Sequence, residues 1–109
     1  MRELDPLDYF ATLTRAPGVH LVVFVKSGCG ACRAMLAALR AGPPPGVVVH
    51  VVDGDAGPGL IADYEIEHFP ALFVWRDGEY HAAIAAPPRP AALREAIAAA
   101  LARPAEPEP

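Results

Sequence analysis

Two cysteines separated by two residues stand at the junction between a predicted strand and a predicted helix. They are Cys29 and Cys32, the only two cysteines of the 109-residue chain. The residues Leu21–Val25 that precede them are all apolar, which is typical of a buried strand. After them, apolar residues recur at the spacing of one helix face: Cys32, Met35, Leu36 and Leu39. The pattern predicts a strand–turn–helix unit whose first helical turn brings both thiols close to disulfide distance.

This placement favours thiol–disulfide chemistry. The free N–H groups at a helix N-terminus favour a thiolate, and Cys29 would face them. Disulfide exchange needs an attacking thiolate and a second thiol that resolves the mixed disulfide, so we assign these roles to Cys29 and Cys32 respectively. A closed zinc site would need four ligands, and the chain has no second cysteine pair. We therefore expect no metal and no other cofactor, with an inert pair of small residues as the plain alternative.

Composition narrows the classes of partner. Thirteen acidic against nine basic residues give a formal net charge of −4, and no cluster of Lys and Arg is present. We therefore expect neither nucleic acid nor an anionic membrane as partner. No apolar stretch approaches the ~20 residues of a membrane span. The first residues, Met1–Pro6, lack an apolar signal segment, so we expect a cytoplasmic protein, in which a disulfide is more often catalytic than structural.

The rest of the chain alternates helices and strands. A first helix is predicted from an Asp5 N-cap, with Pro6 at its first position, to a stop before Pro17. The other predicted helices span residues 31–41, 58–64 and 90–102, and the predicted strands span residues 19–25, 47–52, 71–75 and 79–84. We expect one domain over residues 1–102 and a disordered tail rich in Pro and Glu over residues 103–109.

The order α-β-α-β-α-β-β-α resembles the thioredoxin family, and the resemblance extends from Asp5 to Ala102. Its specific marks are Cys29-Gly30-Ala31-Cys32, Phe69-Pro70 directly before a strand, and Asp77-Gly78 in the last hairpin. The resemblance implies a thioredoxin-like α/β fold, a central mixed sheet flanked by helices. We expect four strands, because only Met1–Leu4 precede the first helix and the family's extra N-terminal strand is missing there.

The same resemblance places a substrate surface around the cysteine pair. It assigns substrate contacts to six residues: Gly28, Gly30, Ala31, His68, Phe69 and Pro70. In the family this proline is cis and lies beside the active cysteines. The backbone of Phe69 could then pair with an extended substrate strand. Whether the Phe69 side chain is a docking surface or part of the core stays open.

The sequence also departs from the family pattern. Gly28 stands where general thioredoxins have an aromatic residue, and Ala31 stands in place of a proline between the cysteines. Val23 replaces the buried acid that, in the family, assists proton transfer to and from the resolving thiol. These differences indicate a specialised protein and not the general reductant.

Two functional hypotheses follow. The first is a monomeric thiol–disulfide oxidoreductase that forms a redox-active Cys29–Cys32 disulfide and passes electrons to or from protein thiols and disulfides, with a reductase as a further candidate partner. The second is a thioredoxin-like binding or assembly module that docks a partner on its Phe69-Pro70 surface without redox turnover. The missing acid at Val23 favours the second, and the cysteine spacing favours the first.

Overall fold

A mixed β-sheet forms the centre of the molecule in a computed structural model that describes all 109 residues. The strands lie in the order β1 (Arg2–Glu3), β3 (Val47–Asp53), β2 (Val19–Val25), β4 (Ala71–Arg76) and β5 (Glu79–Ile84). The strands β1, β3 and β2 run parallel, whereas β4 is antiparallel to both β2 and β5. The carboxyl ends of β2 and β3 therefore meet at one edge, where each strand leads into a helical segment.

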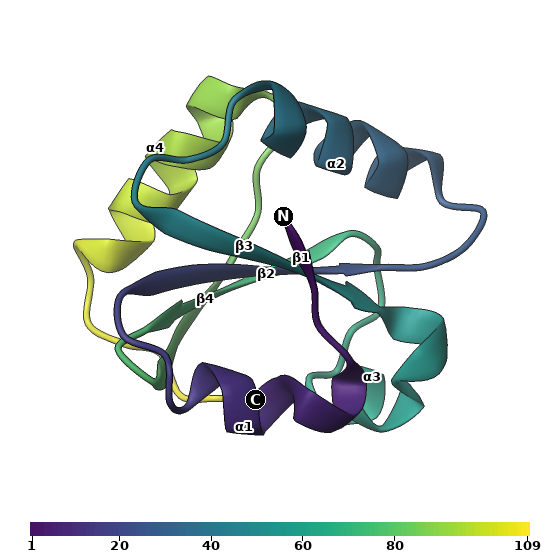
Figure 1. Cartoon of the computed structure of the whole chain (residues 1–109). Coiled ribbons are helices and arrows are strands. Elements are labelled where there is room, and N and C mark those ends of the chain that lie inside the picture. The colour runs from purple at the N-terminus through teal and green to yellow at the C-terminus, as the bar shows by residue number, and fades with distance from the viewer.

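Helices cover both faces of this sheet (Figure 1). The helices α2 (Gly30–Ala41) and α4 (Pro90–Leu101) lie on one face, and α1 (Tyr9–Leu13) and α3 (Pro58–Asp63) lie on the other. Short 3₁₀ turns precede α1 and α3, at Pro6–Asp8 and Gly54–Ala56. Asp5 caps the first turn as predicted, because its Oδ1 accepts the N–H of Leu7 at 2.8 Å. None of the helices is both long enough and apolar enough to span a bilayer.

The predicted α/β fold class is confirmed, with one correction to the sheet. The sheet has five strands and not four, because Arg2 and Glu3 pair in parallel with His50 and Val51 of β3. The N–H of Leu4 continues this pairing with a 2.9 Å hydrogen bond to the carbonyl of Val51. Both residues of β1 are exposed and charged, so they lack the apolar alternation by which a strand is predicted.

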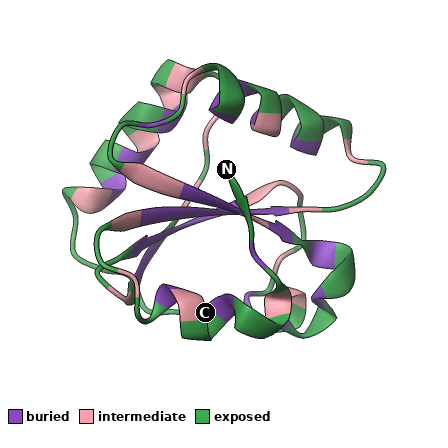
Figure 2. Ribbon diagram, viewed as in Figure 1, coloured by how far each residue is buried: buried purple, intermediate pink, exposed green.

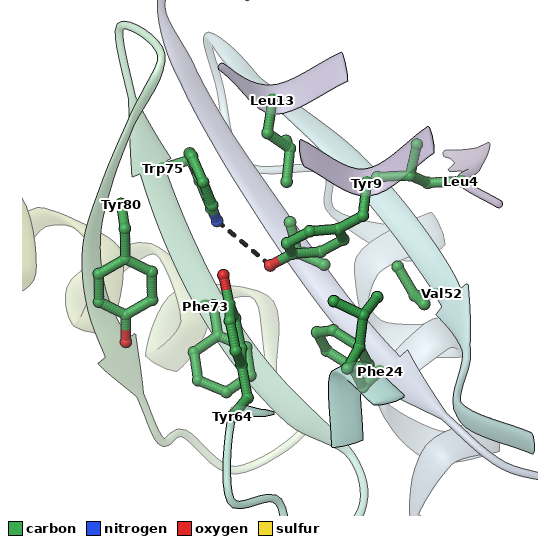
Figure 3. Packing of buried hydrophobic residues seen from close by; sticks show 11 residues of the cluster. Leu4, Tyr9, Leu13, Phe24, Val52, Tyr64, Phe73, Trp75 and Tyr80 are labelled. Atoms are coloured by element: carbon green, nitrogen blue, oxygen red, sulfur yellow. Dashed lines mark hydrogen bonds between the residues drawn. The ribbon is translucent and has the colours of Figure 1, made fainter. Parts of the chain in front are cut away.

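The two faces of the sheet have different cores. Between the sheet and the helices α1 and α3 the core is rich in aromatic side chains. Figure 3 labels these aromatic residues: Tyr9, Phe24, Tyr64, Phe73, Trp75 and Tyr80. The indole N–H of Trp75 donates to the Tyr9 hydroxyl at 3.2 Å. Between the sheet and the helices α2 and α4 the core is aliphatic, and its members include Leu21, Val23, Met35, Leu39, Val74, Leu93 and Ile97. The middle of β2 contributes alternately to both cores and is fully buried, as Figure 2 shows for the centre of the sheet.

The predicted tail at residues 103–109 has neither helix nor strand, and Figure 1 shows the chain end passing from α4 toward α1. Three hydrogen bonds join Glu106 and Glu108 to the domain. The N–H of Glu106 donates to the carbonyl of His81 at 2.7 Å, and the Glu106 carboxylate accepts the N–H of Ala83 at 3.1 Å. The hydroxyl of Tyr64 donates to the Glu108 carboxylate at 2.6 Å. Nothing in the composition of the segment signals these contacts.

A pair of buried histidines joins β2 to β3. Since the carbonyl of Pro17 can only accept, His20 donates Nε2–H to it at 2.9 Å, which leaves His20 Nδ1 to accept Nε2–H of His50 at 2.9 Å. The two rings stack with centroids 5.1 Å apart. Burial, with the nearby charges of His20 and Arg2, lowers the pKa of His50 from 6.5 to about 4. The native state therefore favours neutral His50.

This pair should make the protein sensitive to mild acid. The native pKa of His50 lies below its value in the unfolded chain, so its contribution is complete above pH 6.5 and is lost as the pH falls toward 4. We expect the free energy of unfolding to fall by about 2 kcal/mol between pH 7 and pH 5. Urea unfolding at intervals of pH measures the slope. A His50→Gln variant cannot titrate at this position and should flatten the curve; an unchanged slope would contradict this origin.

Candidate active site

The cysteine pair lies where the strand β2 passes into the helix α2. Cys29 is the N-cap of α2 in an extended conformation, and its Sγ accepts the N–H of Cys32 at 3.1 Å. The two cysteines form a disulfide with Cα atoms 5.2 Å apart. Cys29 is partly exposed, whereas Cys32 is only 3% exposed and belongs to the buried face of α2. An incoming sulfur can therefore reach Cys29 more easily than Cys32; the roles of nucleophile and resolving thiol stay predictions.

The turn before Cys29 is held by a carboxylate from another segment. Asp55 Oδ2 accepts both the N–H and the hydroxyl of Ser27, at 2.9 Å and 2.8 Å. These two bonds lower the pKa of Asp55. Asp53 Oδ1 accepts the N–H of Asp55 at 2.9 Å and fixes the turn on that side. This brace was not predicted from the sequence, although a signal existed: Asp53-Gly54-Asp55 stands at the end of β3, which is parallel to β2 and ends beside it.

Gly28 explains one departure from the family pattern. Its φ is +70°, in the left-handed region that favours glycine, and no atom lies within 4 Å of the position that a Cβ would take. Gly28 is exposed beside Cys29. Where general thioredoxins carry an aromatic side chain, this chain leaves open surface.

The segment Phe69-Pro70 reaches the cysteine pair. The Phe69–Pro70 peptide bond is cis, as the resemblance implied. The carbonyl oxygen of Phe69 lies 3.8 Å from Cys29 Sγ. The ring of Phe69 is half-buried against the aromatic core, and the ammonium of Lys26 lies 5.1 Å from its centroid. The Phe69 side chain thus belongs partly to the core and partly to the surface, so it fits neither of the two alternatives alone.

The other predicted contact residues are placed less closely. His68 is exposed and makes no hydrogen bond, and Gly30 and Ala31 are exposed on the first turn of α2. The guanidinium of Arg33 lies 3.5 Å from the position of a Cβ on Gly30, a contact that was not predicted from the sequence. Substrate contact by the six residues named from the resemblance stays a prediction.

The surroundings of Cys32 contain no buried acid. Val23 is 0% exposed within the aliphatic core, and none of the buried side chains is an Asp or a Glu. The buried polar side chains include three histidines, His20, His50 and His81. His81 is occupied, since its Nε2–H donates to the carbonyl of Ala100 at 2.7 Å. No group of three or more His, Cys, Asp or Glu side chains is placed to hold a metal ion. The site offers two sulfurs and backbone groups, and no internal carboxylate for proton transfer.

Comparison with known proteins agrees with this geometry. The thioredoxin family model matches residues 2–99. The structure of a Fasciola hepatica thioredoxin is 25% identical with a TM-score of 0.75, over 91% of this chain and 98% of that one. No curated protein matches the sequence.

Two further solved structures show the fold alone, because their identities are lower. One comes from a study of the thiol resolving mechanism in yeast mitochondrial 1-Cys peroxiredoxin via glutathione/thioredoxin systems; it is 22% identical, with a TM-score of 0.72, over 91% of this chain and 94% of that one. The other is the zinc-bound form of human ERp44, 21% identical with a TM-score of 0.71. That match covers 90% of this chain and 30% of the ERp44 chain, so this chain spans about a third of its length.

Proposed function

Because the chain belongs to the thioredoxin family, we propose that it is a thiol–disulfide oxidoreductase that exchanges the Cys29–Cys32 disulfide with cysteines of other proteins. One observation carries the proposal: the partly exposed Cys29 Sγ lies at a helix N-terminus, and the buried Cys32 is bonded to it. Both sulfurs that exchange requires are thus in place, with only one open to a substrate.

The exchange proceeds in two substitutions at sulfur. In the reduced protein the Cys29 thiolate attacks one sulfur of a substrate disulfide, forms a mixed disulfide and releases the first substrate sulfur, which takes up a proton. Cys32 then loses its proton and attacks Cys29 Sγ, which releases the second substrate thiol. Two electrons pass to the substrate and the Cys29–Cys32 disulfide forms. The reverse sequence oxidises a substrate dithiol, and a dithiol protein or reductase restores the reduced pair.

Backbone groups assist the attacking sulfur. The N–H of Cys32, which lies 3.1 Å from Cys29 Sγ, can donate to the thiolate in the reduced protein, and the start of α2 adds its partial positive charge. The carbonyl oxygen of Phe69 lies 3.8 Å from the same sulfur. A substrate strand that pairs with this backbone segment would therefore present its disulfide to Cys29. A cytoplasmic location and a monomeric state stay predictions from the sequence.

A second candidate function has one specific observation in its favour. Cys32 has no buried carboxylate near it, since Val23 occupies that position of the family. A protein of this kind could bind a partner on the Phe69-Pro70 surface while its cysteines stay idle. Binding would then be independent of Cys29, and this separates the two functions.

Trapping of substrates tests the proposal directly. In a Cys32→Ser variant the mixed disulfide on Cys29 cannot be resolved, so adducts should accumulate to at least about tenfold above those of a Cys29→Ser control. Non-reducing gels and mass spectrometry of protein incubated with a disulfide protein such as insulin, and with a cell extract, measure the adducts. Release by dithiothreitol shows that they are covalent. Equal amounts of adduct in both variants would contradict the oxidoreductase function. Partners that both variants retain without a covalent bond would favour the binding module.

A further inference from the structure

Two adjoining surface grooves lie beside the segments that flank the redox site, since Phe69 lines the first groove and Ser27 lines the second. They have volumes of about 790 Å³ and 700 Å³, and both are lined by Lys26 and Asp55. The first groove has apolar walls formed by Pro58, Ile61, Ile66 and Phe69. Phe69 links it to the chemistry, because its carbonyl oxygen lies 3.8 Å from Cys29 Sγ. A substrate segment next to a disulfide at Cys29 would therefore lie within reach of this groove.

The grooves are strongly acidic. Six carboxylate side chains line them, against the single ammonium of Lys26: Glu3, Asp5, Asp53, Asp55, Glu65 and Glu67. The Lys26 ammonium lies 5.1 Å from the centroid of the Phe69 ring. Arg33, the cation placed against Gly30 in the first turn of α2, does not line either groove. Charge therefore favours a cationic occupant.

Two backbone features shape the first groove. A Cβ on Gly54 would lie 2.8 Å from the Phe69 ring and 2.9 Å from the carbonyl of Val25, so glycine at this position lets the ring form the wall. Glu65 has φ +52°, in the left-handed region where glycine is favoured over residues with a side chain. The chain carries a glutamate there despite that preference, and its carboxylate lies on the groove.

We propose that these grooves bind a positively charged, partly apolar segment that flanks the reactive cysteine of a substrate protein. The apolar walls take an aliphatic side chain, and the carboxylates take neighbouring Lys or Arg side chains. The inference rests on the proposed oxidoreductase function and adds its substrate class: disulfides with basic flanks are reduced faster than disulfides with acidic ones.

Three disulfide-linked peptides test the proposal. They differ only in the three residues beside the cysteine, which are Lys-Leu-Lys, Ser-Leu-Ser or Glu-Leu-Glu. The reduced protein is mixed with excess peptide at pH 7, quenched with acid, and the second-order rate constant is measured by chromatography. In 20 mM salt we expect the Lys peptide to react about tenfold faster than the Glu peptide, with the Ser peptide between them. In 500 mM salt the ratio should fall below about threefold, because the Debye length is then under ~10 Å.

Matched variants locate the effect. The pair Glu65→Gly and Glu67→Gln removes two carboxylates from the first groove, and the glycine suits the backbone at position 65. It should lower the ratio between the Lys and Glu peptides at least about threefold. The control pair Glu79→Gln and Glu95→Gln makes the same charge change at exposed positions outside both grooves and should keep the ratio.

The outcomes separate this inference from the function on which it rests. Equal rates for the three peptides, or an equal loss of preference in both variant pairs, would overturn the acidic groove while leaving the oxidoreductase intact. A reduced protein that reacts with none of the peptides would overturn the oxidoreductase, and the substrate class with it.

Discussion

Replacing Val23 with aspartate should destabilise the protein and at the same time speed its reduction of protein disulfides. Val23 is 0% exposed among aliphatic side chains on the face that α2 covers. A carboxyl there loses its hydration without a partner, so we expect a loss of about 3 kcal/mol or more in the free energy of unfolding. The same carboxyl would provide the proton acceptor that Cys32 lacks, and this should raise the rate of the resolving step.

The pH dependence identifies the ionisation as the cause. Burial raises the pKa of an aspartate, so the native state holds its proton at pH values where the unfolded chain has released it. The loss of stability should therefore grow as the pH rises above ~4. A Val23→Asn variant matches the shape of aspartate but cannot ionise, so it should lose stability without any gain in turnover. Insulin reduction and urea unfolding measure both properties; an aspartate variant no faster than the asparagine variant would show that the missing acid does not limit the reaction.

Replacing Gly78 with alanine should cause the second large loss. Gly78 and Asp77 form the two-residue turn between β4 and β5, with φ of +82° and +50°. A Cβ on Gly78 would lie 2.5 Å from the carbonyl oxygen of Thr14, and this backbone atom cannot rotate away. The hairpin is also tied to the loop before β2, since Asp77 Oδ1 accepts the N–H of Gly18 at 2.7 Å. We expect a loss of about 3 kcal/mol, from the left-handed φ and the clash together.

Gly46 provides the matched control for this prediction. Its φ is +71°, close to that of Gly78, but no atom lies within 4 Å of the position of its Cβ. Gly46→Ala should therefore cost only the conformational penalty, about 1–2 kcal/mol. Thermal unfolding of the two variants separates the contributions. Equal melting temperatures would mean that Thr14 moves aside at no cost and that the contact does not hold the hairpin.

The sequence was most informative where local pattern and chemistry coincide. The apolar run Leu21–Val25 predicted a strand buried on both faces, and the cysteine spacing predicted the start of α2. The cis bond before Pro70 was implied by the resemblance, and so was the approach of Pro70 to the cysteines. These features depend on a few neighbouring residues or on the arrangement of elements that the family resemblance implies, so they can be predicted from the sequence.

Features that depend on distant parts of the chain were not predicted. Ser27 and Asp55 are 28 positions apart, and they meet only because the ends of β2 and β3 lie side by side. The two residues of β1 become a strand only through β3, and the half-buried position of Phe69 depends on the absence of a Cβ on Gly54. Each case joins residues that meet only through the pairing or packing of separate elements.

The contact of the chain end with β5 affects how the molecule behaves among copies of itself. An open outer strand is a template on which another polypeptide can add hydrogen bonds, and this is a common start of aggregation. Here Glu106 takes up the carbonyl of His81 and the N–H of Ala83 on β5, the last strand of the sheet. Pro104, Pro107 and Pro109 have no N–H to offer to a further strand. The segment therefore occupies part of the outer edge of β5 without offering a further strand, and this disfavours pairing with another copy at that point.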